Sequence, residues 1–96
     1  MLTIEQIKKA FAKIGKKYGI KNAYLFGSYA KGTANESSDI DIVIDRGEIK
    51  TLMQLSGLRL DLIDELGKDV DIVTNDSILP NFLNSIKNDM VLVYGA

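Results

Sequence analysis

The first part of the chain repeats apolar residues with the period of a helix. Thr3 followed by Gln6 is a capping-box pattern, and apolar residues then recur every three or four positions until Gly19, which is a helix stop signal. Residues 4–18 are therefore predicted to form an amphipathic helix. A second stripe of this kind runs through residues 50–66 and ends at Gly67. Its members are Leu52, Leu55, Leu58, Leu62 and Leu66.

Residues 39–45 alternate between two sides with the period of a strand, and Val43 is the one apolar residue on the side of the aspartates. Ile40, Ile42 and Ile44 are predicted to face the core, and the acidic residues of this segment lie on the opposite side. Shorter patterns predict strands at residues 23–26, 70–73 and 90–94 and a helix at residues 80–88. This order of elements predicts one α/β domain spanning residues 1–96, with a small mixed sheet flanked by helices.

Composition places the chain among ordinary globular proteins. Apolar residues make up 46% and charged residues 26%, with one proline. Apolar runs of a few residues fall short of the roughly 20 that cross a membrane, so a cytoplasmic protein without membrane contact is expected. Residues 1–32 carry seven lysines against Glu5 alone. We interpret most of them as a solvated helix face, and direct binding of nucleic acid is not expected.

Cysteine and histidine are both absent, which limits the chemistry that the chain can perform. Without them there is no disulfide, no thiolate or imidazole metal ligand and no Ser/His/Asp arrangement. Catalysis must then use carboxylates, hydroxyls, lysine or arginine. Carboxylates are hard oxygen ligands, so a metal in such a site would be magnesium or manganese rather than zinc.

Asp39 and Asp41 form a like-charge pair on the predicted strand. Being two residues apart, they share a face, with Cα atoms roughly 6.5 to 7 Å apart. At an effective dielectric constant of about 20, two such charges some 6 Å apart repel by roughly 3 kcal/mol, which a divalent cation would offset. The alternative is a solvated, half-exposed strand face with no ligand.

Gly27 and Ser28 close the first strand and begin a segment of small residues. Such a segment can offer backbone N–H groups and a hydroxyl to phosphate oxygens, or it can be an ordinary turn. Gly27 and Gly32 have the spacing of a Walker A loop, but the Gly-Lys-Ser/Thr ending is missing. No Gly-x-Gly-x-x-Gly occurs either, so neither a P-loop nor a Rossmann site is predicted.

These motifs together carry a family resemblance. Gly27-Ser28, ten intervening residues and Asp39-Ile40-Asp41 resemble the signature of the DNA polymerase beta-like nucleotidyltransferase superfamily. The sequence of residues 27–34 and 38–42 is similar to that of the minimal nucleotidyltransferase (MNT) family. The similarity continues through residues 66–67, 70–73 and 91–94 and so covers most of the chain.

The resemblance implies a mixed sheet with flanking helices, a nucleoside triphosphate substrate, most simply ATP, and two magnesium ions held by three carboxylates. Here those carboxylates would be Asp39, Asp41 and Asp71, as catalytic and metal-binding residues. Asp71 follows from the resemblance alone, because spacing does not single it out. Gly27 and Ser28 would contact the nucleotide, whereas Lys31 is as compatible with a solvated loop lysine as with a phosphate contact.

The resemblance to the MNT family implies that this chain transfers AMP from ATP to a hydroxyl of a partner protein. The expected partner is a small helical HEPN toxin, modified on a tyrosine, with this chain as its antitoxin. Two alternatives remain open: nucleotidyl transfer to a small molecule such as an aminoglycoside, and a non-catalytic antitoxin that acts by binding alone. The sequence does not distinguish them.

Overall fold

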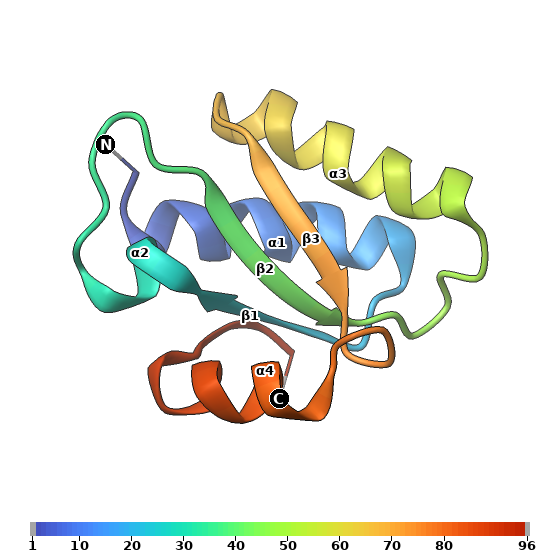
Figure 1. Ribbon diagram of the computed structural model, residues 1–96. Helices are drawn as coiled ribbons and strands as arrows, with labels where there is room; N and C mark the ends of the chain where they lie inside the picture. Colours follow the sequence, from blue (N-terminus) through green and yellow to red (C-terminus); the bar gives the residue numbers. More distant parts are fainter. Residues whose placement is uncertain (1, 96) are drawn as a thin grey trace.

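The computed structural model describes residues 2–95 as a four-stranded sheet with helices packed against it (Figure 1). In chain order the elements are α1 (Ile4–Tyr18), β1 (Asn22–Phe26), α2 (Gly27–Lys31), β2 (Ile40–Asp45), α3 (Leu52–Leu66), β3 (Val70–Thr74), α4 (Pro80–Ile86), the 3-10 turn η1 (Lys87–Asp89) and β4 (Val91–Tyr94). No helix in this part of the chain is long and apolar enough to cross a bilayer.

The sheet has the strand order β3-β2-β1-β4. β1 pairs antiparallel with both β2 and β4, whereas β2 and β3 are parallel. A parallel pair needs a long crossover, which α3 supplies between β2 and β3. The mixed sheet with flanking helices predicted from the sequence is confirmed.

One face of the sheet carries the hydrophobic core. Ile40, Ile42 and Ile44 of β2 are at most 1% exposed, as the alternating pattern predicts. Figure 1 shows α1 and α3 side by side behind this face. The same core includes the buried residues Ile7, Phe11 and Ile14 of α1, Ala23 and Leu25 of β1, Leu58 and Leu62 of α3, Val70 of β3 and Val93 of β4.

The two long helices begin and end through local signals in the sequence. The predicted capping box of Thr3 and Gln6 is present, and Thr51 with Gln54 forms a second one at the start of α3. α3 therefore begins at Leu52, two residues later than predicted. Gly19 and Gly67 end the helices in the left-handed conformation, which glycine adopts without steric cost.

Leu52 corrects the predicted apolar stripe of α3, because its side chain is 82% exposed. Successive helical residues are rotated by about 100°, so Leu52 points about 100° away from the direction midway between Leu58 and Leu62. Those two leucines reach the core, while Leu55 and Leu66 at intermediate angles are half-buried. The stripe is real, but its first member lies at the edge.

Three of the five lysines of α1, Lys8, Lys13 and Lys17, form ion pairs with acidic residues. Lys17 Nζ lies 2.8 Å from Asp61 Oδ2 on α3, and the Tyr18 hydroxyl donates to the same oxygen at 2.8 Å. Lys13 approaches Glu65 of α3 at 3.4 Å. These contacts join the two core helices across their exposed edges.

We expect Asp61→Asn to lower the thermal midpoint at neutral pH. The hydrogen bond from Lys17, then that from Tyr18, lowers the pKa of Asp61, so ionised Asp61 stabilises the fold above the pKa it has when unfolded. This contribution is lost as pH falls through the folded pKa, and the difference from wild type should vanish in acid. Thermal melts from pH 7 down to pH 2.5 measure it. Asp64→Asn is the control, and an equal loss in both variants would contradict the assignment.

Candidate functional site

The face of the sheet opposite α1 and α3 carries the acidic residues. Side chains alternate along a strand, so Phe26 and Asp41 point away from the core that Leu25 and Ile40 enter. Helix α4 lies on this second face, because Phe82 packs edge-on against the ring of Phe26. The rest of the face is open enough that Asp39 and Asp71 are exposed.

Strand register sets Asp41 between two neighbours. Asp41 is the cross-strand partner of Phe26 on β1 and of Asp71 on β3, so the three residues form a row across the sheet. Adjacent strands are about 4.8 Å apart, which places the backbones of Asp41 and Asp71 within reach of a shared ligand. Asp39 immediately precedes β2 and lies two residues before Asp41. The fold thus brings the three predicted aspartates together.

The electrostatics of this cluster are unfavourable. Partial burial raises the pKa of Asp41, and the negative charges of Asp71 and Asp39 raise it further. Both neighbours act in the same direction, and no cation is among the causes of the shift. A carboxylate held among like charges is the environment that a divalent cation relieves.

Gly27 brings the backbone directly against this carboxylate. It begins α2 with a φ of 72°, and a Cβ at this position would overlap Asp41 Oδ2. Any other residue would be strained in its backbone, and its Cβ would push the Asp41 carboxylate out of this position. Position 27 therefore needs glycine so that the chain can turn beside Asp41.

The remaining predicted nucleotide contacts come from the same turn. Ser28 lies in the first turn of α2 and is half-buried, next to Gly27. Lys31 is exposed in the last turn, four residues from Gly27 and so on the same side of the helix. Ser28 is adjacent to the acidic row by sequence, whereas Lys31 stands one turn away from it.

The donor set fits a hard divalent cation, since three carboxylates share one sheet face without a basic partner among the causes of the Asp41 shift. As the side chains stand, no three acidic groups within residues 2–95 are gathered tightly enough to hold a metal ion. Mutual repulsion favours such a separation. The strand register, not preformed coordination, is what groups these residues.

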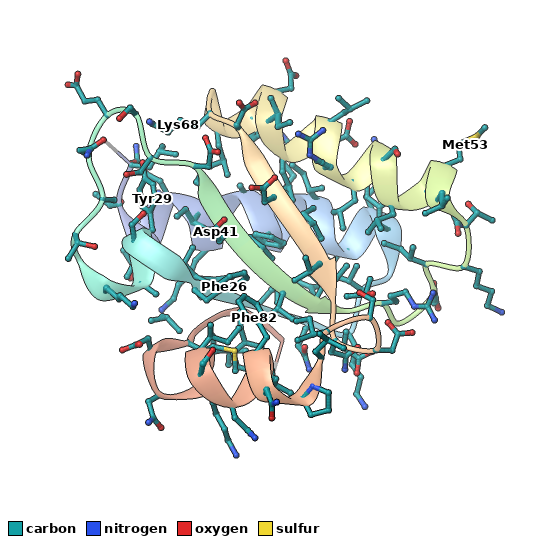
Figure 2. All side chains as sticks on the ribbon, in the orientation of Figure 1. Phe26, Tyr29, Asp41, Met53, Lys68 and Phe82 are labelled. Carbon is teal, nitrogen blue, oxygen red and sulfur yellow. The ribbon has the colours of Figure 1, made fainter. Side chains whose placement is uncertain are left out.

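Sequence reasoning missed two features of this region. Lys68 donates hydrogen bonds to the carbonyls of Glu36 and Ser38, and so ties down the loop that leads into Asp39. Phe82, on the face of α4 toward the sheet, lies beyond Phe26 as seen from Asp41 (Figure 2). Neither had a local signal, because both contacts join segments far apart in the chain.

Two surface hollows lie away from the acidic row. One of about 310 Å³ lies between the start of α3 and the end of β3, and one of about 400 Å³ lies between α1 and β4. Neither is lined by Asp39, Asp41 or Asp71. The site is therefore defined by charge and strand register.

Known proteins resemble this chain in sequence and in fold. The model of the nucleotidyltransferase domain family matches residues 4–93. A Methanocaldococcus jannaschii protein named "Putative protein adenylyltransferase MJ0435" is 42% identical over 90 residues, covering 94% of this chain and 97% of the relative.

Two solved structures share the fold. One, described as a "putative minimal nucleotidyltransferase", has a TM-score of 0.80 and 28% identity and covers 94% of this chain and 95% of its own. The other, described as a toxin-antitoxin with AMP-PNP, has a TM-score of 0.78 and 25% identity, with 93% and 73% covered. With the acidic row and the turn at Gly27 in place, this chain belongs to the nucleotidyltransferase domain family, among its minimal members, and is a nucleotidyltransferase.

Proposed function

We propose that this protein transfers AMP from ATP to a hydroxyl of a partner protein. The observation that carries the proposal is the row of carboxylates, in which Asp41 has a raised pKa between Asp71 and Asp39 and lies against the backbone of Gly27. Two comparisons support the finer reading: a 42% identical relative named as a protein adenylyltransferase and a similar fold described as a toxin-antitoxin with AMP-PNP.

In this proposal Asp39, Asp41 and Asp71 are the metal ligands, and the metal is magnesium or manganese, with two ions. When bound, these ions neutralise the triphosphate and the attacking and leaving oxygens of an in-line displacement. Gly27 has no side chain, so its backbone lies directly against the Asp41 carboxylate and a phosphate bound at Asp41 can approach that backbone. Ser28 donates its hydroxyl to a phosphate oxygen, and Lys31 lies at the outer end of the same turn.

Asp71 has the position of a proton acceptor. It is exposed on β3, the edge strand of the sheet, so an acceptor hydroxyl can reach it from outside. The hydroxyl oxygen forms a bond to the α-phosphorus while the bond from that phosphorus to the bridging oxygen breaks. The proton passes to Asp71, and pyrophosphate leaves from the opposite side.

The proposed partner is a small helical toxin of the HEPN type, modified on a tyrosine hydroxyl, with this chain as the antitoxin. A site on an open sheet face, away from the two hollows described above, suits an acceptor group that projects from a second protein. Transfer to a small hydroxylated molecule and neutralisation by binding alone are outcomes that the following experiment separates.

This protein is incubated with magnesium, ATP labelled at the α-phosphate and the protein encoded by the neighbouring gene. We expect AMP to be transferred to that neighbouring protein. Mass spectrometry identifies the modified residue, and Asp39→Asn and Asp41→Asn should both abolish labelling. Label on a small molecule alone would replace the protein acceptor. Neutralisation of the neighbour by both variants, without any label, would instead support binding alone.

Asp41→Asn should stabilise the metal-free fold while abolishing magnesium binding. Because the pKa of Asp41 is raised in the folded state, its ionised form destabilises the fold above that pKa, and this cost disappears as pH falls through it. Melts in EDTA should show a higher midpoint for the variant at pH 7, with the gap closing in acid. Asp45→Asn, on the same face of β2, is the control. Unchanged magnesium affinity by calorimetry would refute the site.

Ser28→Ala should reduce turnover about ten- to a hundredfold, because a hydrogen bond to a charged group contributes roughly 1.5 to 3 kcal/mol. The fold should persist, because Ser28 is only half-buried and is not among the residues of the hydrophobic core, unlike its neighbour Tyr29. Steady-state rates of AMP transfer measure the effect, with Ser56→Ala on α3 as the control. Equal rates in the two variants would show that Gly27-Ser28 is an ordinary turn without a phosphate contact.

A further inference from the structure

Helix α4 is attached to the sheet in an unusual way. None of its residues is buried, yet it lies on the face that carries the acidic row. Its aromatic contact with the sheet is between Phe82 and Phe26, whose ring centroids are 5.9 Å apart with the planes inclined at 83°. In this edge-to-face arrangement one ring presents its edge to the face of the other.

Phe82 remains 45% exposed despite this contact. An aromatic residue that served only to anchor a helix would be expected to bury most of its ring, since buried area provides the stabilisation. Phe82 instead leaves a large part of an apolar surface in solvent beside a charged site. The exposed part is therefore available to a flat apolar ligand.

The position of this pair relative to the carboxylates is fixed by strand register. Phe26 is the cross-strand partner of Asp41, and Asp71 lies on the opposite side of Asp41. The row from the edge strand inward is Asp71, Asp41 and Phe26, followed by Phe82 from α4, and Figure 2 shows the last three in this succession. A nucleotide whose phosphates lie at Asp41 thus has its acceptor side at Asp71 and its other side at the aromatic pair.

We propose that Phe82, supported by Phe26, stacks on the base of the nucleotide substrate. This inference rests on the proposed function, because it needs a nucleoside triphosphate at the acidic row. Aromatic stacking is tolerant of base identity, since every base has a π-face. Phe82 therefore determines that the ligand is a nucleotide rather than a bare polyphosphate, and it does not select adenine.

The test compares ATP with magnesium tripolyphosphate, which has the phosphates of ATP without its base. Phe82→Ala should weaken ATP binding about ten- to a hundredfold and leave tripolyphosphate binding unchanged, both measured by calorimetry. Phe82→Tyr keeps the ring and should bind ATP with wild-type affinity. Phe82→Leu keeps the apolar volume but not the ring, so its affinity for ATP should fall as much as that of Phe82→Ala. Leu79→Ala, at the 75% exposed residue before α4, is the matched control.

A fluorescence measurement provides a second readout. The chain has no tryptophan, so Phe82→Trp introduces a single reporter. ATP and GTP should both quench its emission by stacking, whereas tripolyphosphate should not.

Three results would overturn the inference. ATP affinity of Phe82→Ala within twofold of wild type would remove the stacking contact while leaving the nucleotidyltransferase proposal intact. Equal weakening of ATP and tripolyphosphate would make Phe82 a structural anchor of α4. Absence of ATP binding by the wild-type protein would refute the proposed function itself, and this inference with it.

Discussion

The parallel pairing of β2 with β3 is the constraint on which the site depends. It places Asp41 and Asp71 side by side on one face, although thirty positions separate them in the chain. A shift of one residue in this register would turn Asp71 toward the opposite face, because side chains alternate along a strand. The buried residues Ile40 and Val70, which are also paired in this register, hold it in place through the core.

Strand β2 therefore carries both the electrostatic repulsion at Asp41 and the apolar burial that offsets this repulsion. Asp41 is held among like charges on one face of β2, while three fully buried isoleucines lie on the other. Burial of each such side chain contributes roughly 1.5–3 kcal/mol, so the three together exceed the repulsion of one carboxylate pair, which is roughly 3 kcal/mol at an effective dielectric of about 20. The acidic face can then remain strained without unfolding the strand that bears it.

How much the sequence could predict depended on whether a feature was local. The capping box at Thr3 and the alternation of Ile40, Asp41 and Ile42 involve neighbours in the chain, and both predictions are confirmed. The exposure of Leu52 required the rotation of α3 relative to the sheet, which spacing alone does not give. Asp71 was predicted from the family resemblance alone, because nothing in Val70 to Val73 distinguishes an acid at a site from an acid in solvent.

Contacts between distant segments could not be predicted from the sequence, because they depend on how those segments pack together. The weak pattern at residues 80–88 predicted a helix but not which face of the sheet it would cover, so the pairing of Phe82 with Phe26 could not be foreseen. Lys68 is similar, since its hydrogen bonds to carbonyls of residues 36 and 38 depend on how two loops meet.

These two contacts lie on opposite sides of the carboxylate row, one holding the loop before Asp39 and the other extending the face beyond Asp41. The two faces of the sheet thus have different roles, one forming the hydrophobic core and the other carrying the candidate site. α1 and α3 exclude water from the first face, and the second is left partly uncovered, with its charges and one aromatic pair accessible to ligands.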